Sequence, residues 1–276
     1  MTTVDGMSRL GELTFVGLGL NSEKSVSLLG LEEAKKAETV FVELYTSLMP
    51  ELDLSRLEKL IGKHVHVILR RDLEENSGKK ILQSADKGKT VLLVPGDPLM
   101  ATTHVDLRIR AEKQGTKTRI VHGASIVSAV IGLSGLQNYK FGRGVTIPFS
   151  DMDSFDATPY NVIGENQKMD LHTLCFLDIR AEEKRYMTIK DALDVLSTLE
   201  RKKQQRVVTG NTLAVGIARA GSDNPAVKAD FVKQLQKFNF GKPPHTLVFP
   251  GKLHFMEAEA LVTLAKAPQE ILEMTK

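Results

Sequence analysis

The sequence predicts two α/β domains, and three observations support this fold class. Strand-like and helix-like segments alternate from Leu13 onward, as in a mostly parallel sheet with helices on both faces. This rhythm is interrupted after Gly123 by a glycine-rich stretch and then resumes. The 276 residues are enough for one large core or two modest ones. We expect a disordered lead-in over residues 1–11, an N-terminal domain over 12–123 and a C-terminal domain over 124–276.

The first half contains five apolar, strand-like runs that end in polar or glycine-containing turns. The predicted strands are Leu13–Leu18, Thr39–Tyr45, Val65–Leu69, Thr90–Val94 and Thr118–Val121. Apolar residues at helical spacing lie between them. The predicted helices are Val26–Ala37, Leu52–Ile61, Glu74–Ala85 and His104–Gln114.

A loop-rich stretch separates the two halves, and we assign the junction between the domains to it. It is marked by Gly135, Tyr139, Gly142, Gly144 and Pro148. Further strands are predicted at Thr173–Asp178, Leu213–Arg219 and Thr246–Phe249, and further helices at Ile189–Lys202, Lys228–Gln236 and Phe255–Ala265. The apolar stretch from Ala124 to Leu136 has the length of a buried helix and is shorter than the roughly 20 residues of a membrane span.

Composition excludes several classes of protein. A net charge of +3 gives no support to a nucleic-acid or membrane partner. The single cysteine, Cys175, rules out an intrachain disulfide and a cysteine-based zinc cluster, so we expect a cytoplasmic protein. Cys175 lies in an apolar run and is predicted to be a buried structural thiol. The histidines show no metal-ligand spacing, and no metal is expected.

Two glycine-containing turns follow predicted strands, at Gly17-Leu18-Gly19 and at Pro95-Gly96-Asp97-Pro98. Ligands of open α/β sheets bind at the carboxyl ends of the strands, so the two turns suggest one shared crevice. The alternative for the Pro95-Gly96-Asp97-Pro98 turn is an ordinary connection from a strand to a helix. The first turn lacks the last glycine of a dinucleotide fingerprint, because Ser22 occupies that position, and a nicotinamide site is disfavoured.

His245 is the histidine that we single out for binding. It follows Pro243-Pro244 and opens a predicted strand, so its ring is presented at a fixed place. The alternative is a loop histidine whose ring is hydrogen-bonded within the protein and binds no ligand. His104 and His122 are interpreted as a helix start and a strand end.

In order along the chain, the motifs resemble those of the diphthine synthases. They are Phe15-Val16-Gly17-Leu18-Gly19-Leu20, Val42-Glu43-Leu44-Tyr45-Thr46-Ser47, Val94-Pro95-Gly96-Asp97-Pro98-Leu99, His122-Gly123-Ala124-Ser125-Ile126 and the segment from Pro243 to His254. This family belongs to the S-adenosylmethionine (SAM) methyltransferases whose relatives methylate tetrapyrroles. The resemblance extends from about Leu13 to near the carboxyl terminus.

The resemblance implies two α/β domains of the tetrapyrrole-methylase-like type (class III), with SAM in the cleft between them, and a homodimer. It also implies a protein substrate, the 3-amino-3-carboxypropyl histidine of translation elongation factor 2. Archaeal-type members transfer three methyl groups to its amino nitrogen, whereas eukaryotic members add a methyl ester. The chain has no long insertions, so we expect the trimethylated product.

Motif by motif, the resemblance implies eight SAM-binding residues. They are Leu20, Asp97, Met100, Ser125, Ile126, Leu177, Ala220 and His245. No catalytic side chain is implied, and we expect no acid or base to be indispensable, because a dry cleft disfavours the ammonium form of the substrate amine. Glu43 and Tyr45 are candidates for the pocket around the substrate nitrogen, which becomes bulkier and positively charged as methyl groups are added. Glu43 would supply a carboxylate there, and Tyr45 the face of an aromatic ring. Glu43 as a structural acceptor of backbone N–H groups is the alternative.

Other functions remain open from sequence. A tetrapyrrole or ribosomal-RNA methyltransferase would share the architecture, although the modest net charge does not favour RNA. A non-enzymatic SAM-binding module would bind the cofactor without producing S-adenosylhomocysteine. A dinucleotide oxidoreductase is disfavoured by the complete Gly-Asp-Pro turn and by the motif that ends at His254.

Overall fold

The computed structural model describes residues 11–150 and 155–275, and the chain divides between Ser125 and Ile126 into two compact units. We call the part up to Ser125 the first unit and the rest the second unit. The expected lead-in lies outside the described residues except for Gly11, which is buried and whose carbonyl accepts from the Lys117 N–H at 3.1 Å. No helix in the described ranges is long and apolar enough to cross a membrane.

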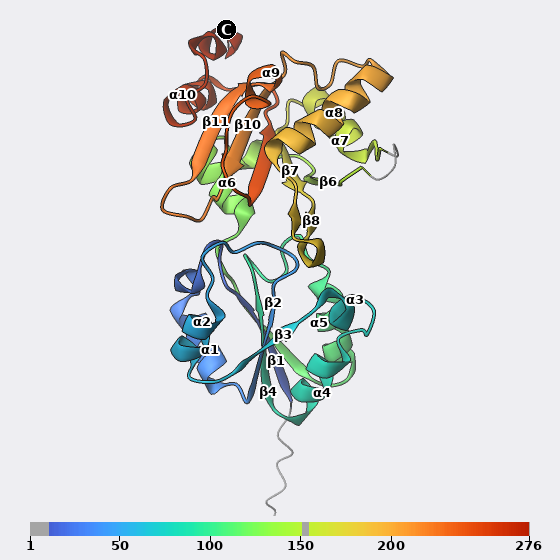
Figure 1. The fold of residues 1–276 in the computed structure, drawn as a ribbon, viewed down its shortest axis with the longest axis vertical. Coiled ribbons are helices and arrows are strands. Elements are labelled where there is room, and N and C mark those ends of the chain that lie inside the picture. The colour runs from blue at the N-terminus through green and yellow to red at the C-terminus, as the bar shows by residue number, and fades with distance from the viewer. Residues whose placement is uncertain (1–10, 151–154, 276) are drawn as a thin grey trace, which may run out of the picture. The chain divides into compact units, whose positions relative to one another are not determined.

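The first unit contains a five-stranded parallel sheet in the order β3-β2-β4-β1-β5 (Figure 1). The strands are β1 (Glu12–Gly17), β2 (Thr39–Glu43), β3 (Val65–Ile68), β4 (Lys89–Val94) and β5 (Lys117–Val121). The central strands are buried on both faces, which explains their near-continuous apolar sequence. All five strands predicted for this half are confirmed.

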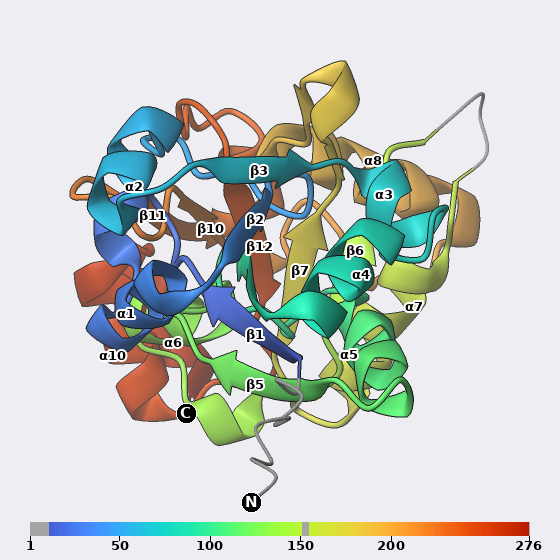
Figure 2. The ribbon, with the colours of Figure 1, turned by 90° about the horizontal axis from the view of Figure 1, so that it is seen from below.

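Helices cover both faces of this sheet (Figure 2). They are α1 (Leu28–Lys36), α2 (Leu54–Ile61), α3 (Arg70–Glu74), α4 (Lys79–Lys87) and α5 (His104–Lys113). Alternate strand residues point to opposite faces, so Val16 and Leu93 pack with α1 and α2, whereas Phe15 and Leu92 pack with α4 and α5. The carboxyl ends of β1, β2, β4 and β5 are followed by loops, whereas a single residue separates β3 from α3.

The single helix expected at Glu74–Ala85 is wrong. The structure has two helices there, since α3 ends at Glu74 and α4 begins at Lys79. Between them, Ser77 and Gly78 adopt positive φ angles of 55° and 65°. A right-handed helix cannot continue through two residues in this conformation, and glycine is the residue that adopts it most easily.

The second unit has a mixed five-stranded sheet in the order β11-β10-β12-β7-β6. Its strands are β6 (Val145–Ile147), β7 (Thr173–Leu177), β10 (Leu213–Ala218), β11 (Ala226–Phe231) and β12 (His245–Phe249). Only the β6–β7 pair is parallel among these strands. A small hairpin is formed by β8 (Ile179–Arg180) and β9 (Arg185–Tyr186). The mostly parallel sheet expected from the sequence is thus correct for the first unit and wrong for the second.

Five helices are described in the second unit, and they lie on both faces of its sheet (Figure 1). They are α6 (Ile126–Ser134), α7 (Thr158–Lys168), α8 (Ile189–Lys203), α9 (Val232–Leu235) and α10 (Phe255–Leu264). One core contains residues of α7 and α8, and the other contains residues of α6 and α10. Cys175 of β7 is fully buried in the first of these cores, as predicted, and burial raises the pKa of its thiol. Four short 3₁₀ segments complete the described elements: Glu23–Ser25, Asn138–Lys140, Ala181–Glu183 and Gln269–Thr275.

Two further expectations for this half are wrong. The helix expected at Lys228–Gln236 is instead the strand β11 followed by one helical turn, and the alternation of Val227, Ala229 and Phe231 with polar residues is the period of a strand. The loop-rich stretch at 135–148 is not the junction, because it lies inside the second unit and contains β6. Helix α7 lies in a segment where the sequence predicted no helix or strand.

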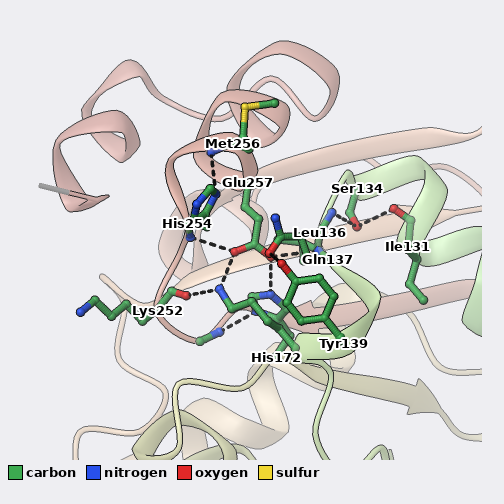
Figure 3. A network of polar contacts seen from close by, with 12 residues as sticks. Ile131, Ser134, Leu136, Gln137, Tyr139, His172, Lys252, His254, Met256 and Glu257 are labelled. Carbon is green, nitrogen blue, oxygen red and sulfur yellow. Dashed lines mark hydrogen bonds and ion pairs between the residues drawn. The ribbon is translucent and has the colours of Figure 1, made fainter.

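A buried carboxylate fastens the loop after α6 to α10 (Figure 3). Glu257 and His172 are both fully buried, and Glu257 Oε1 accepts from His172 Nε2 at 2.7 Å and from the Gln137 N–H at 2.9 Å. Glu257 Oε2 accepts from the His254 N–H at 2.8 Å and from Lys140 Nζ at 2.5 Å. These four donors come from segments that are far apart in sequence, so this carboxylate joins three parts of the second unit.

Candidate active site

Three glycines meet where β1, β4 and β5 end. A Cβ atom on Gly17 would lie 2.5 Å from the Gly96 carbonyl oxygen and 2.6 Å from the Gly123 nitrogen. A Cβ atom on Gly123 would lie 2.5 Å from the same oxygen. Gly19 and Gly96 have φ angles of 76° and 72°, and the Gly96 N–H donates to the Gly19 carbonyl at 2.6 Å. The loops after the three strands are therefore packed backbone to backbone, which only glycine allows.

This close packing brings Asp97 and His122 together across the end of β1. Asp97 follows β4, His122 follows β5, and β1 lies between these strands in the sheet. Asp97 Oδ2 accepts from His122 Nδ1 at 2.7 Å and from the Gly123 N–H at 3.4 Å. The Asp97 side chain is 13% exposed, whereas that of His122 is 77% exposed. Asp97 is thus a fixed acceptor at the carboxyl end of the strands.

The other residues predicted in the first unit lie at the same edge. Leu20 is partly buried and directly follows Gly19. The Met100 N–H donates to the Asp97 carbonyl at 3.2 Å, and the Met100 side chain is about half exposed. Ser125 is partly buried and comes two residues after Gly123. The structure therefore groups the four predicted residues of the first unit around the three strand ends.

Three of the predicted residues in the second unit also meet at one end of its sheet. His245 pairs with Ala218, and the next residue of β12 pairs with Phe176, so His245 lies beside Leu177. Ala220 follows β10 closely, and the preceding residue donates its N–H to the Pro244 carbonyl at 2.8 Å. Ile126, the fourth, begins α6. Like Ala220, it packs against the core that α6 shares with α10.

The ring of His245 has a defined tautomer. Its Nδ1 accepts a hydrogen bond from the Ile189 N–H at 3.2 Å, so the proton of the neutral ring is on Nε2. Burial lowers the pKa of His245, although the carbonyls of Lys242 and Gly241 act in the opposite direction. The Nε2 atom is buried and has no partner among the described residues. An unpaired buried N–H costs free energy, and a bound ligand with an acceptor atom would remove that cost.

Each set of residues, taken by itself, offers a polar group that suits the cofactor that the sequence motifs imply. SAM carries ribose hydroxyl groups that donate hydrogen bonds and adenine nitrogens that accept them. Asp97 supplies a fixed acceptor, and the Nε2–H group of His245 supplies an unused donor. The backbone-packed glycines hold the ends of β1, β4 and β5 together, and Asp97 follows one of these strand ends.

The Glu43 carboxylate is occupied by donors of its own loop and of α5. This carboxylate is fully buried and accepts from the Tyr45 N–H at 3.0 Å, from the Thr46 N–H at 3.1 Å and from the Thr46 hydroxyl. His104 Nε2 lies 3.2 Å from the second oxygen. One face of the Tyr45 ring is covered by the Arg70 guanidinium, 5.5 Å from the centroid. The structure therefore favours the alternative interpretation, in which Glu43 is an acceptor of backbone N–H groups.

The Glu43→Gln substitution is expected to lower stability by about 2 kcal/mol without changing the number of methyl groups transferred. The amide can accept at one end only, so at least one buried donor loses its partner. Chemical denaturation and the mass distribution of the product measure the two effects, with Glu51→Gln, an exposed acidic residue of the same unit, as control. A stable variant that stalls after one methyl group would assign Glu43 to the cation pocket instead.

Comparison with known proteins identifies one group of relatives. The family model Tetrapyrrole (Corrin/Porphyrin) Methylases matches residues 12–236. Diphthine synthase of Methanosarcina mazei is 49% identical over 266 residues, which are 95% of this chain and 98% of that protein. Diphthine synthase of Methanocella arvoryzae is 48% identical over 253 residues, which are 92% of this chain and 98% of that protein. A crystal structure of diphthine synthase superimposes with a TM-score of 0.86 at 45% identity and covers 95% of this chain and 99% of that chain.

Proposed function

Since this chain belongs to the diphthine synthase family of SAM-dependent methyltransferases, we propose that it trimethylates the amino group of the 3-amino-3-carboxypropyl histidine of translation elongation factor 2. This reaction is a step of diphthamide biosynthesis, the process to which the family belongs. The near-full-length similarity to diphthine synthases is the observation that supports the proposal most strongly. A homodimer that acts in the cytoplasm, where the elongation factor works, is part of the same proposal.

The proposal includes the residues that bind SAM. Leu20, Asp97, Met100 and Ser125 of the first unit, and Ile126, Leu177, Ala220 and His245 of the second, are assigned to it. The fixed carboxylate of Asp97 and the unpaired Nε2–H group of His245 are the polar groups that support this assignment. The apolar members, which end or follow strands or begin a helix, contribute backbone groups and surface.

The protein contributes mainly by binding and orientation. When bound, SAM supplies an electrophilic methyl group, and its sulfur keeps the electron pair of the broken sulfur–carbon bond. The protein holds the acceptor amine in line with that bond, which is worth up to roughly 7–11 kcal/mol in favourable cases. Exclusion of water favours the neutral, nucleophilic form of the amine.

Mass spectrometry of the elongation factor tests the proposal. The factor that carries the unmethylated modified histidine is incubated with the protein and SAM, and the gain of three methyl groups on the intact factor is expected. Parallel reactions with a tetrapyrrole and with ribosomal RNA test the alternative substrates. Methylation of either of these, with an unchanged mass of the factor, would contradict the proposal.

The His245→Ala substitution is expected to weaken SAM binding about tenfold, which corresponds to the loss of one hydrogen bond. Calorimetry of SAM binding measures this effect, and thermal unfolding without the cofactor shows whether the fold is retained. His66→Ala, which removes an exposed histidine on β3, is the matched control. An unchanged affinity in His245→Ala would remove His245 from the binding site.

A further inference from the structure

His122 has the geometry of a histidine that is oriented by a carboxylate. Its Nδ1 lies 2.7 Å from Asp97 Oδ2, and Asp97 is itself fixed because the same oxygen also accepts from the Gly123 N–H. The carboxylate only accepts hydrogen bonds, so Nδ1 carries the proton of the neutral ring. The lone pair of the ring is then on Nε2, and the side chain is 77% exposed at the open end of the sheet. This arrangement leaves a basic nitrogen available to a bound molecule.

The proposed reaction requires a proton acceptor. An amine in water is mostly an ammonium ion, and its nitrogen becomes nucleophilic only after the loss of a proton. Conversion of a primary ammonium to a trimethylammonium group releases three protons in all, one for each methyl group. Exclusion of water lowers the cost of deprotonation but does not carry the proton away.

We propose that His122 Nε2 is the proton acceptor for the substrate amine, an inference that rests on the proposed function. In this step an N–H bond of the substrate ammonium breaks, its electron pair remains on nitrogen and the proton moves to Nε2. The nitrogen lone pair then forms the new bond to the methyl carbon. Because the ring is exposed, the imidazolium releases its proton to solvent before the next cycle. This assignment revises the expectation that no side chain serves as a base.

The other described histidines are less suited to this step. His104 and His172 are buried, and each has a ring nitrogen bonded to a buried glutamate. The lone pair of His245 is occupied by the Ile189 N–H, so protonation of that ring would break a hydrogen bond. His64 makes a similar contact with Glu58, but it precedes β3 and so lies at the amino end of the strands, opposite the edge where Asp97 lies. His66 lies within β3, and the lone pair of His254 Nδ1 accepts from the Met256 N–H.

The position of His122 also supports its role. It is bonded directly to Asp97, which is assigned to SAM, so it lies one side chain away from the proposed cofactor site. The glycine packing described above allows this bond across the end of β1, because any larger residue at Gly17 would separate the loops. A histidine whose purpose was only to hold Asp97 would show the same contact, and the experiment must distinguish the two roles.

His122→Asn makes this distinction. The asparagine amide donates to Asp97 much as Nδ1 does, but it has no basic nitrogen. We expect kcat for methylation of the elongation factor to fall on the order of 100-fold, the lower end of the usual range for general base catalysis, with the SAM dissociation constant unchanged. His122→Ala should lose similar activity and regain part of it with added imidazole. His66→Asn, on the exposed edge strand, is the matched control and should retain wild-type rates.

A spectroscopic measurement complements the kinetics. In ¹⁵N NMR spectra of the free wild-type protein, His122 should show the tautomer with its proton on Nδ1. Wild-type kcat in His122→Asn, a loss confined to SAM affinity, or the opposite tautomer would each overturn the assignment. If the wild-type protein and His66→Asn also fail to methylate the factor, the proposed function fails and the assignment with it, so the two failures are distinguishable.

Discussion

Replacement of Gly17 by alanine is expected to destabilise the first unit by about 3 kcal/mol, the upper part of the usual range for overpacking, and to abolish SAM binding. The added Cβ atom would lie 2.5 Å from a carbonyl oxygen and 2.6 Å from a backbone nitrogen. Both are backbone atoms of neighbouring loops, so no side chain can rotate away to make room. Separation of these loops would also separate Asp97 from His122. Chemical denaturation and calorimetric titration with SAM measure the two effects.

Gly132→Ala is the matched control for this substitution. Gly132 lies in α6, is exposed, and a Cβ atom there would meet nothing within 4 Å. Alanine is a better helix former than glycine, so this variant should gain roughly 0.5–1 kcal/mol and bind SAM normally. A Gly17→Ala protein that binds SAM as the wild type does would show that the close packing is not required for the site.

The Glu257→Gln substitution should lower the free energy of unfolding of the second unit by about 3–5 kcal/mol, as expected when one partner of a buried ion pair is removed. Glu257 accepts four hydrogen bonds, including those of Lys140 and His172 (Figure 3). His172 Nδ1 accepts from the Gly251 N–H, so its proton is on Nε2 and must find an acceptor. An amide at residue 257 would present its own N–H₂ group to some of these donors.

The same carboxylate predicts how stability depends on pH. Burial alone raises the pKa of Glu257, but the hydrogen bonds from His254, Lys140, Gln137 and His172 outweigh it and lower the pKa from 4.5 to about 2. The unfolded chain therefore takes up a proton at a higher pH than the folded chain. The contribution, on the order of 3 kcal/mol, is complete above pH 4.5 and is lost as the pH falls towards 2.

Glu259→Gln is the control for both measurements, because Glu259 is exposed on the same helix. Its stability should stay within about 0.5 kcal/mol of the wild type. Urea denaturation at neutral pH and between pH 5 and pH 3 compares the three proteins. If wild type and Glu257→Gln lose stability equally on acidification, Glu257 does not contribute in the way described.

The first unit could be predicted well from sequence because its signals are local. Its central strands are buried on both faces and read as apolar runs, such as Thr90–Val94. Apolar spacing predicted α1, α2 and α5, but not the break between α3 and α4. The second unit was predicted less well. Its antiparallel pairing depends on which strands meet, and no local pattern specifies that for β10, β11 and β12.

In the candidate site, too, residues with a local sequence signal could be predicted, whereas contacts that depend on strand order could not. Asp97 and His245 could be proposed from the sequence because glycine and proline mark their turns. The role of His122 could not, since its partner is 25 residues away and the two meet only through the strand order β4-β1-β5. His104 is likewise 61 residues from Glu43, whose structural role becomes evident only once its donors are known. The sequence did contain one signal, since Asp97 and His122 each follow a strand closely.

Tandem mass spectrometry of the modified histidine, after reaction with SAM that carries a deuterated methyl group, shows whether this protein trimethylates the amino nitrogen. We expect three labelled methyl groups on the amino nitrogen and none on the carboxylate. Mild alkali, which would cleave an ester, should remove no label. An elongation factor without label on this histidine, while the protein still binds SAM, would contradict this expectation.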